Sequence, residues 1–138
     1  MTITADDKFA IQELFARCAY AYDERKERLL ADCFTTDAVF TLRIAGGDLV
    51  GPFEGRESIM GLMTGSMAEQ TDVRRHVVSN LFFEEEGAEP VAISGLTLIA
   101  TENEDIQLLS AGIYRDVVTK QEGIWRICKR HLDLDKAY

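Results

Sequence analysis

The sequence is poor in the residues that most catalytic and metal-binding motifs need. It has two histidines, three cysteines, two prolines and one tryptophan among 138 residues. These residues form no closely spaced set of metal ligands, and the chain has neither a glycine-rich phosphate loop nor a nucleophile motif. Chemistry that depends on such motifs therefore has no support in the sequence.

Positive charge is also scarce. The chain has 15 lysines and arginines against 24 aspartates and glutamates, which gives a net charge of -9. Nucleic acids and anionic membranes bind basic patches. We therefore expect neither as a partner, whereas the charge says nothing specific about a small-molecule substrate.

Cysteine usage and hydropathy predict the compartment. Cys18, Cys33 and Cys128 are an odd set without close pairing, and the first two fall on apolar helical positions. We expect reduced core cysteines. No apolar run approaches the length that spans a bilayer, and residues 1–7 are polar and acidic, unlike a signal peptide. The expected location is the cytoplasm.

The length predicts one domain over residues 1–138 with a sizeable core. Thr4 and Asp7 form a capping-box pattern, and apolar residues then recur at helical spacing as far as Tyr22. Further helices are expected at 26–34 and 58–68. Alternation predicts short strands at 38–44 and 49–53.

The second half of the chain is almost all strand. The expected strands are 76–84, 91–101, 106–119 and 124–134, separated by polar or glycine-containing turns. Such turns indicate an antiparallel meander. The predicted fold is α+β: a curved antiparallel sheet with about three helices packed on one face, forming a cone around an apolar pocket.

Asp23 and His76 carry the chemistry that the sequence offers. Asp23 closes the first helix and His76 opens an apolar strand. A neutral imidazole can take a proton from carbon, and a carboxylate on its other nitrogen fixes the tautomer and stabilises the imidazolium. The alternative is a structural histidine at the core edge and an ordinary helix-terminal acid. An acid there opposes the helix dipole, which favours the functional interpretation.

Short motifs follow one another in order: Tyr22-Asp23 at the end of the first helix, and the segments 34–40, 55–59, 75–80, 112–116 and 123–127. Together they resemble the SnoaL-like branch of the nuclear transport factor 2-like superfamily, which has a cystatin-like fold. The resemblance covers nearly the whole chain. It implies the cone-shaped fold more strongly than any one activity, because this fold hosts enzymes, binding proteins and non-catalytic subunits.

The resemblance implies an activity similar to that of scytalone dehydratase-type lyases. These cofactor-free enzymes carry a catalytic acid at the end of the first helix and a histidine at the start of the middle strand. The roles map onto Asp23 and His76, and a tyrosine before the acid maps onto Tyr22.

Three departures separate this chain from enzymes of this kind. Residues 94–96 stand where scytalone dehydratase has a second pocket histidine, and Cys18 stands where dehydrochlorinases of the family have a lysine. The pocket arginine of the dehydrochlorinases would fall near residues 118–119. We therefore expect neither substrate-specific residue set here.

A second branch is also similar. The terminal strand, Trp125 to Asp135, resembles that of small (β) subunits of aromatic-ring-hydroxylating dioxygenases, although this chain is shorter than most of them. Such subunits usually have no active site. A β subunit or a non-catalytic small-molecule-binding protein therefore remains the alternative to an enzyme.

Other pocket candidates are Tyr22, Asn80, Tyr114, Phe40 and Met63. Tyr22 could donate a hydrogen bond to a substrate oxygen, or could end with its hydroxyl at the surface. Asn80 follows His76 by four residues, so strand alternation places both on one face. Asn80 could orient substrate or pair with a neighbouring strand.

Asp116 and the acids near the C-terminus have structural alternatives. Asp116 could be a second pocket acid, but an ion pair with Arg115 or Arg126 is favoured. Asp133 and Asp135 share a strand face without a histidine at ligand spacing, so we expect no metal site.

These observations favour a cofactor-independent lyase or isomerase, acting by dehydratase-type proton transfer on a small apolar cyclic or aromatic metabolite. His76 would be the general base and acid, Asp23 its orienting partner and Tyr22 a hydrogen-bond donor. No cofactor is implied. The resemblance also implies a homodimer or higher homo-oligomer, because sheets of this branch usually pair through their outer faces.

Overall fold

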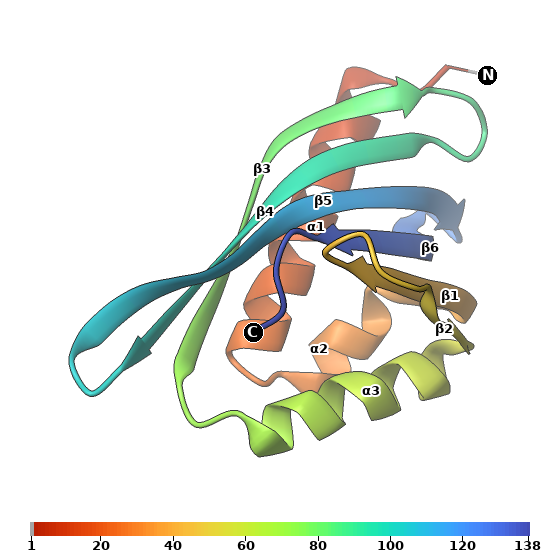
Figure 1. Cartoon of the computed structure of the whole chain (residues 1–138). Coiled ribbons are helices and arrows are strands. Elements are labelled where there is room, and N and C mark those ends of the chain that lie inside the picture. The colour runs from red at the N-terminus through yellow and green to blue at the C-terminus, as the bar shows by residue number, and fades with distance from the viewer. Residues whose placement is uncertain (1) are drawn as a thin grey trace.

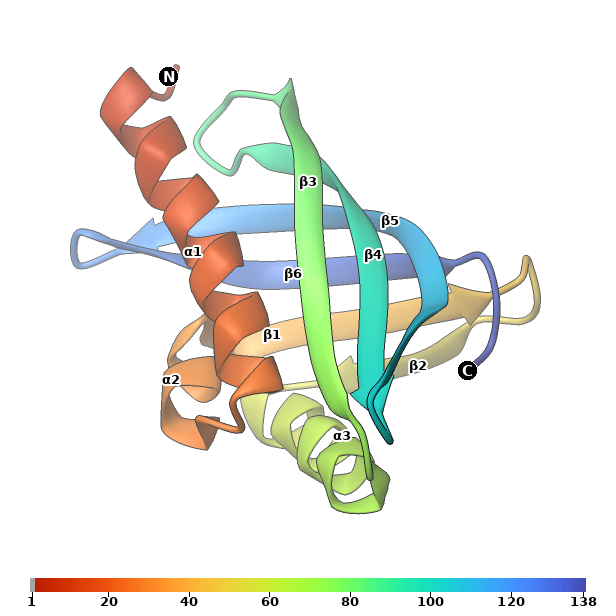
Figure 2. The same cartoon turned by 90° about the vertical axis from the view of Figure 1, so that its left-hand side faces the viewer.

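The computed structural model describes residues 2–138, within which three helices and six strands are arranged about one curved sheet (Figure 1). The helices are α1 (Ala5–Asp23), α2 (Glu27–Asp32) and α3 (Arg56–Glu69). The strands are β1 (Phe34–Ile44), β2 (Val50–Glu54), β3 (Val73–Glu85), β4 (Val91–Glu102), β5 (Asp105–Gln121) and β6 (Ile124–Leu134). The helices lie on one side of the sheet (Figure 2), so the predicted α+β architecture is confirmed. Across residues 2–138, no helix combines the length and the apolar composition that crossing a membrane requires.

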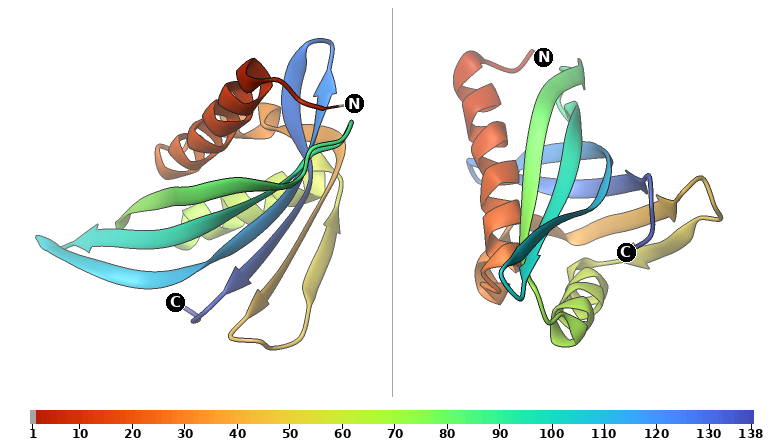
Figure 3. Two further views of the ribbon diagram at one scale, coloured as in Figure 1. Left: turned by 90° about the horizontal axis from the view of Figure 1, so that it is seen from above. Right: turned by 60° about the vertical axis from the view of Figure 1, so that its left-hand side comes forward.

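The sheet has the strand order β2-β1-β6-β5-β4-β3 and remains open, with β2 and β3 at its edges. Strands β3 to β6 pair antiparallel in succession, as their turns predict. In contrast, β1 pairs with β6 in parallel, so the sheet is mixed rather than wholly antiparallel. Seen from above, the strands fan out and bend around the helical side (Figure 3).

Helix α1 begins at its predicted cap. The Thr4 hydroxyl accepts a hydrogen bond from the backbone N–H of Asp7, and the Asp7 carboxylate accepts one from the backbone N–H of Thr4, both at 3.0 Å. Asp7 also accepts a hydrogen bond from the indole of Trp125 on β6 at 3.2 Å. The cap therefore fixes the start of α1 against the sheet while the helix runs on to Asp23.

The boundary between α2 and β1 differs from the prediction. Helix α2 ends at Asp32, and strand β1 begins at Phe34 rather than at Ala38. Residues 33–34 pair with strand β6 instead of continuing the helix, because the backbone N–H of Ile127 donates to the Cys33 carbonyl at 2.8 Å. Arg56 then donates two hydrogen bonds, of 2.6 and 3.0 Å, to the Phe34 carbonyl. Long-range pairing overrides the local helical pattern.

A β-bulge interrupts the alternation of β3. Its register with β4 shifts beyond residue 79, and Asn80 has a φ of 55°. Before the bulge His76 and Val78 turn inward, whereas after it Leu81 does. Asn80 and Phe82 are exposed. The prediction that His76 and Asn80 lie on the same face of the strand is therefore wrong. One inserted residue moves every later side chain to the opposite face.

Candidate active site

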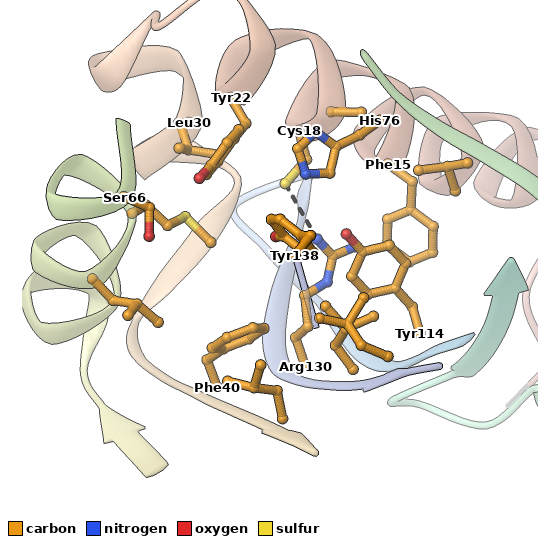
Figure 4. A pocket seen from close by; sticks show the side chains of 17 residues that line it. Phe15, Cys18, Tyr22, Leu30, Phe40, Ser66, His76, Tyr114, Arg130 and Tyr138 are labelled. Carbon is orange, nitrogen blue, oxygen red and sulfur yellow. Dashed lines mark hydrogen bonds between the residues drawn. The ribbon is translucent and has the colours of Figure 1, made fainter. Parts of the chain in front are cut away.

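The concave side of the sheet and helices α1 and α3 enclose a cavity of about 150 Å³ (Figure 4). Its walls are mainly apolar and are supplied by widely separated parts of the chain. Five of the predicted site residues line it: Tyr22, Phe40, Met63, His76 and Tyr114. The structure thus brings residues from α1, β1, α3, β3 and β5 to one pocket, which suits a small, largely apolar ligand.

The Asp23 carboxylate holds His76 at two points. One oxygen lies 2.6 Å from the ring Nδ1, and the other accepts a hydrogen bond from the His76 backbone N–H at 2.7 Å. The Asp23 side chain is only 6% exposed and that of His76 only 12%, so water does not compete strongly for either. The pair predicted from the sequence is therefore assembled, with the backbone and the ring of His76 fixed by one acid.

This geometry determines which nitrogen of His76 is available. Because the carboxylate accepts the Nδ1 proton, the neutral ring presents Nε2 as its acceptor. A proton taken up on Nε2 would produce an imidazolium that is stabilised by Asp23. The pair can thus accept and return a proton at the wall of the pocket.

Tyr22 packs directly against this pair. Its ring centroid lies 4.8 Å from that of His76 in an edge arrangement. Burial raises the pKa of the Tyr22 phenol, and the nearby Tyr138 adds to the effect. The phenol therefore stays protonated at neutral pH and can act as a hydrogen-bond donor in the pocket.

A second buried ion pair faces the same cavity and was not predicted. Arg130 of β6 lines the pocket and donates hydrogen bonds of 2.7 and 3.2 Å to Asp116 of β5. Its guanidinium also lies 4.0 Å from the ring centroid of Tyr114. Burial disfavours the charge of Arg130, but Asp116 raises the pKa of Arg130 above its ordinary value, so the guanidinium stays charged.

The expectation that Asp116 pairs with Arg115 or Arg126 is therefore wrong. Arg115 points to the outer face and binds Glu84 at 3.0 Å. A bulge after residue 117 shifts the β5–β6 register, so that Asp116 lies opposite Arg130. The sequence shows the tight turn before β6, from which a regular register would follow, but it does not show the bulge that shifts this register. For the same reason the sequence did not place an arginine in the pocket.

Cys18 lines the pocket beside this pair. The Arg130 guanidinium lies 3.5 Å from its sulfur. The Cys33 thiol lowers the pKa of Cys18 to about 7, and Arg130 contributes in the same direction against the opposing effect of burial. Cys18 is thus a core residue, as expected, but it also contributes a polarisable sulfur to the pocket wall.

Of the predicted site residues, Asp23 reaches this pocket only through His76, and Asn80 does not line it. Asn80 lies in a second hollow between α1 and β3, with Gln12 and Ser79. Sequence reasoning also missed Ser66 and Tyr138, which line the main pocket. Among residues 2–138 there is no cluster of three or more histidine, cysteine, aspartate or glutamate side chains that could hold a metal ion.

Fold and site together are those of a cone-shaped α+β protein with an acid–histidine pair inside an apolar pocket. The chain belongs to the SnoaL-like domain family, whose model matches residues 4–131. Among characterised relatives, the chain is 27% identical over 124 residues to the gamma-hexachlorocyclohexane dehydrochlorinase of Sphingobium indicum. That match covers 88% of this chain and 76% of the relative.

Solved structures show the same fold. A protein of Catenulispora acidiphila in complex with S-DNPA is 26% identical, with a TM-score of 0.83 and 96% of each chain covered. A Novosphingobium aromaticivorans protein, described as the beta subunit of an aromatic-ring-hydroxylating dioxygenase, is 17% identical. Its TM-score is 0.79, with 94% of this chain and 89% of that chain covered. The fold is thus shared with a protein that carries a bound ligand and with one described as an oxygenase subunit.

Proposed function

We propose that the protein is a cofactor-independent lyase or isomerase that moves a proton on a small, mostly apolar cyclic or aromatic compound. The observation that carries this proposal is the buried contact of Asp23 with both the ring and the backbone of His76. The elimination chemistry of the dehydrochlorinase relative supports it. The apolar lining of the pocket favours a substrate with few charged groups.

In the proposed mechanism, Nε2 of His76 removes a proton from a substrate carbon next to an activating group. Asp23 keeps the ring oriented and stabilises the imidazolium that forms. Tyr22 donates a hydrogen bond to the oxygen on which negative charge develops, or to a departing hydroxyl. Arg130 adds fixed positive charge to the pocket wall beside Cys18, where it could stabilise a leaving group that gains negative charge. Loss of the leaving group, or return of the proton elsewhere, completes an elimination or an isomerisation.

The test is turnover of two probe classes by the wild type and three variants. Cyclic β-hydroxy ketones report dehydration through enone absorbance, and γ-hexachlorocyclohexane reports elimination through chloride release. His76→Ala should lower turnover by about 10²–10⁴-fold, the contribution of one general base. Asp23→Asn should also lower it, and nitrogen NMR should show that the ring no longer holds its proton on Nδ1 alone.

His131→Ala is the matched control. His131 is the other histidine of the chain, and its ring nitrogens contact Thr41 and Asp133 rather than the pocket. This variant should keep wild-type turnover. Turnover that survives in His76→Ala, with the fold confirmed by circular dichroism, would refute the mechanism.

The second candidate is a non-catalytic binding protein or an oxygenase β subunit. It is favoured by the neighbour that carries S-DNPA and by the shared fold of the dioxygenase beta subunit. This candidate predicts that apolar ring compounds raise the melting temperature without being converted. It also predicts that the protein co-purifies from its native source with a larger iron-containing chain.

A further inference from the structure

The segment that follows β6 turns back over the pocket. Its residue Tyr138 lines the cavity together with His76 and Arg130, and all three are labelled in Figure 4. The residue is 55% exposed and also lines the cavity, so it faces both solvent and the pocket. Tyr138 is thus positioned at the boundary between the candidate active site and the outside.

Two hydrogen bonds fix the backbone of this segment. The backbone N–H of Asp135 donates to the Ala111 carbonyl at 2.8 Å. The buried hydroxyl of Ser110 donates to the Lys136 carbonyl at 2.6 Å. Both partners belong to β5, so the segment is attached to the sheet just before it reaches the pocket.

A third contact fixes the ring itself. The Arg74 guanidinium lies 5.0 Å from the centroid of the Tyr138 ring. Asp72 in turn holds Arg74 through bonds of 2.8 and 3.4 Å, and both of these side chains are only 15% exposed. Arg74 precedes His76 by two residues on the inward face of β3, so the ring is tied to the strand that carries the candidate base.

The Tyr138 phenol lines the same cavity as two other phenols, those of Tyr22 and Tyr114. It contributes to raising the pKa of Tyr22 on one wall and of Tyr114 on another, although burial is the main cause in both. Burial likewise raises the pKa of Tyr138 itself. All three phenols are protonated at neutral pH and can donate hydrogen bonds to the same ligand.

We propose that Tyr138 is a gate and specificity-determining residue of this pocket: its ring, held by Arg74, covers His76 and limits access to compact ring compounds. A ligand must fit beneath the ring or displace it. The phenol would also favour ligands that carry an oxygen within reach. The inference rests on the pocket of the proposed function, but it does not require that the pocket catalyse a reaction.

The test measures access to His76 directly. Diethyl pyrocarbonate acylates neutral imidazole nitrogen, and peptide mass spectrometry gives the rates for His76 and His131 in the same sample. The His131 rate is an internal reference, because its side chain lies away from the pocket and is 26% exposed. The quantity compared is the ratio of the His76 rate to the His131 rate.

Tyr138→Ala should raise this ratio roughly tenfold, because it removes the ring that covers His76. A tenfold change is about the factor expected from the loss of one partly buried cation–π contact. Tyr138→Phe keeps the ring and should keep the wild-type ratio. Arg74→Gln should give an intermediate ratio, because the ring remains but loses its cation. Tyr20→Ala, an exposed tyrosine on α1, is the matched control and should change nothing.

An unchanged ratio in Tyr138→Ala would overturn the gate. A rate ratio as high in Tyr138→Phe as in Tyr138→Ala would overturn the role of the ring. Melting temperatures exclude general unfolding, which would also expose His131. If His76→Ala retains turnover while Tyr138→Ala raises the rate ratio, the proposed mechanism fails and the gate stands. If His76→Ala loses turnover while Tyr138→Ala leaves the rate ratio unchanged, the mechanism stands and the gate fails.

Discussion

At the scale of single residues, two buried carboxylates each hold a different side chain of the pocket wall. Asp23 binds the ring and the backbone N–H of His76, and a neutral ring can still gain a proton. Asp116 binds Arg130, a group that is already charged and whose pKa is raised further by Asp116 despite burial. The proposed mechanism therefore gives proton transfer to His76 and uses Arg130 as a fixed charge.

Removing the charge of Asp116 should be costly. Asp116→Asn leaves the guanidinium of Arg130 buried without its counter-ion and should lower the free energy of unfolding by about 3–5 kcal/mol. Arg115→Gln breaks an ion pair whose side chains are 47% and 45% exposed, and should cost less than about 1 kcal/mol. Denaturant unfolding measures both. Equal losses in the two variants would contradict the distinction between the buried and the exposed pair.

At the scale of elements, both ends of helix α1 are attached to the sheet. Its first turn is capped by Thr4 and bound through Asp7 to β6, and its last residue, Asp23, holds β3. Movement of the helix along its axis would break both attachments. The position of the candidate acid therefore depends on contacts made almost the whole length of the helix away.

The cap predicts a specific acid sensitivity. The Thr4 backbone N–H, together with the Thr4 hydroxyl, Trp125 and Lys120, lowers the pKa of Asp7 from 3.8 to about 2. Since the pKa is lower in the folded state, the stabilisation is fully present above about pH 4 and is lost as the pH falls towards 2. The difference in unfolding free energy between wild type and Asp7→Asn should shrink over that range. A difference that stays constant from pH 6 to pH 2 would refute this assignment.

The sequence predicted most elements and the Asp23–His76 pair, because capping and periodicity are local signals and the resemblance supplied the roles. It did not predict Asn80 outside the pocket or Arg130 inside it. Both errors have one physical cause, a one-residue bulge that changes which side chains face inward. Neither bulge has a glycine or other clear local signal; Asn80 adopts a positive φ within an ordinary-looking strand.

At the scale of the whole molecule, the convex face of the sheet carries several exposed apolar side chains. Val73, Val77, Ile106, Leu108 and Ile113 are between 43% and 73% exposed. Cross-strand partners place Val77 and Ile113 on either side of β4, on the face away from the helices. An apolar face of this kind is a candidate interface, and the predicted homo-oligomer remains a prediction.

Charged substitutions on this face test the prediction. Light scattering after size exclusion should give the wild type at least twice the mass of one chain, and the double variant Leu108→Asp with Ile113→Asp should give the mass of a single chain. Phe9→Asp is the matched control, since Phe9 is 70% exposed on α1, away from the convex face. A wild type that is monomeric at micromolar concentration would refute the prediction.

The parallel pairing of β1 with β6 determines when the molecule can be completed. In the sheet β6 lies between β1 and β5, so until the ribosome has released it the strands exist as two separate groups. Each group then presents an unpaired backbone edge to neighbouring chains, a state prone to aggregation. Strand β6 also brings Arg130 and leads to Tyr138. The nascent chain therefore loses its exposed edges and gains these pocket residues once β6 and the segment after it have emerged.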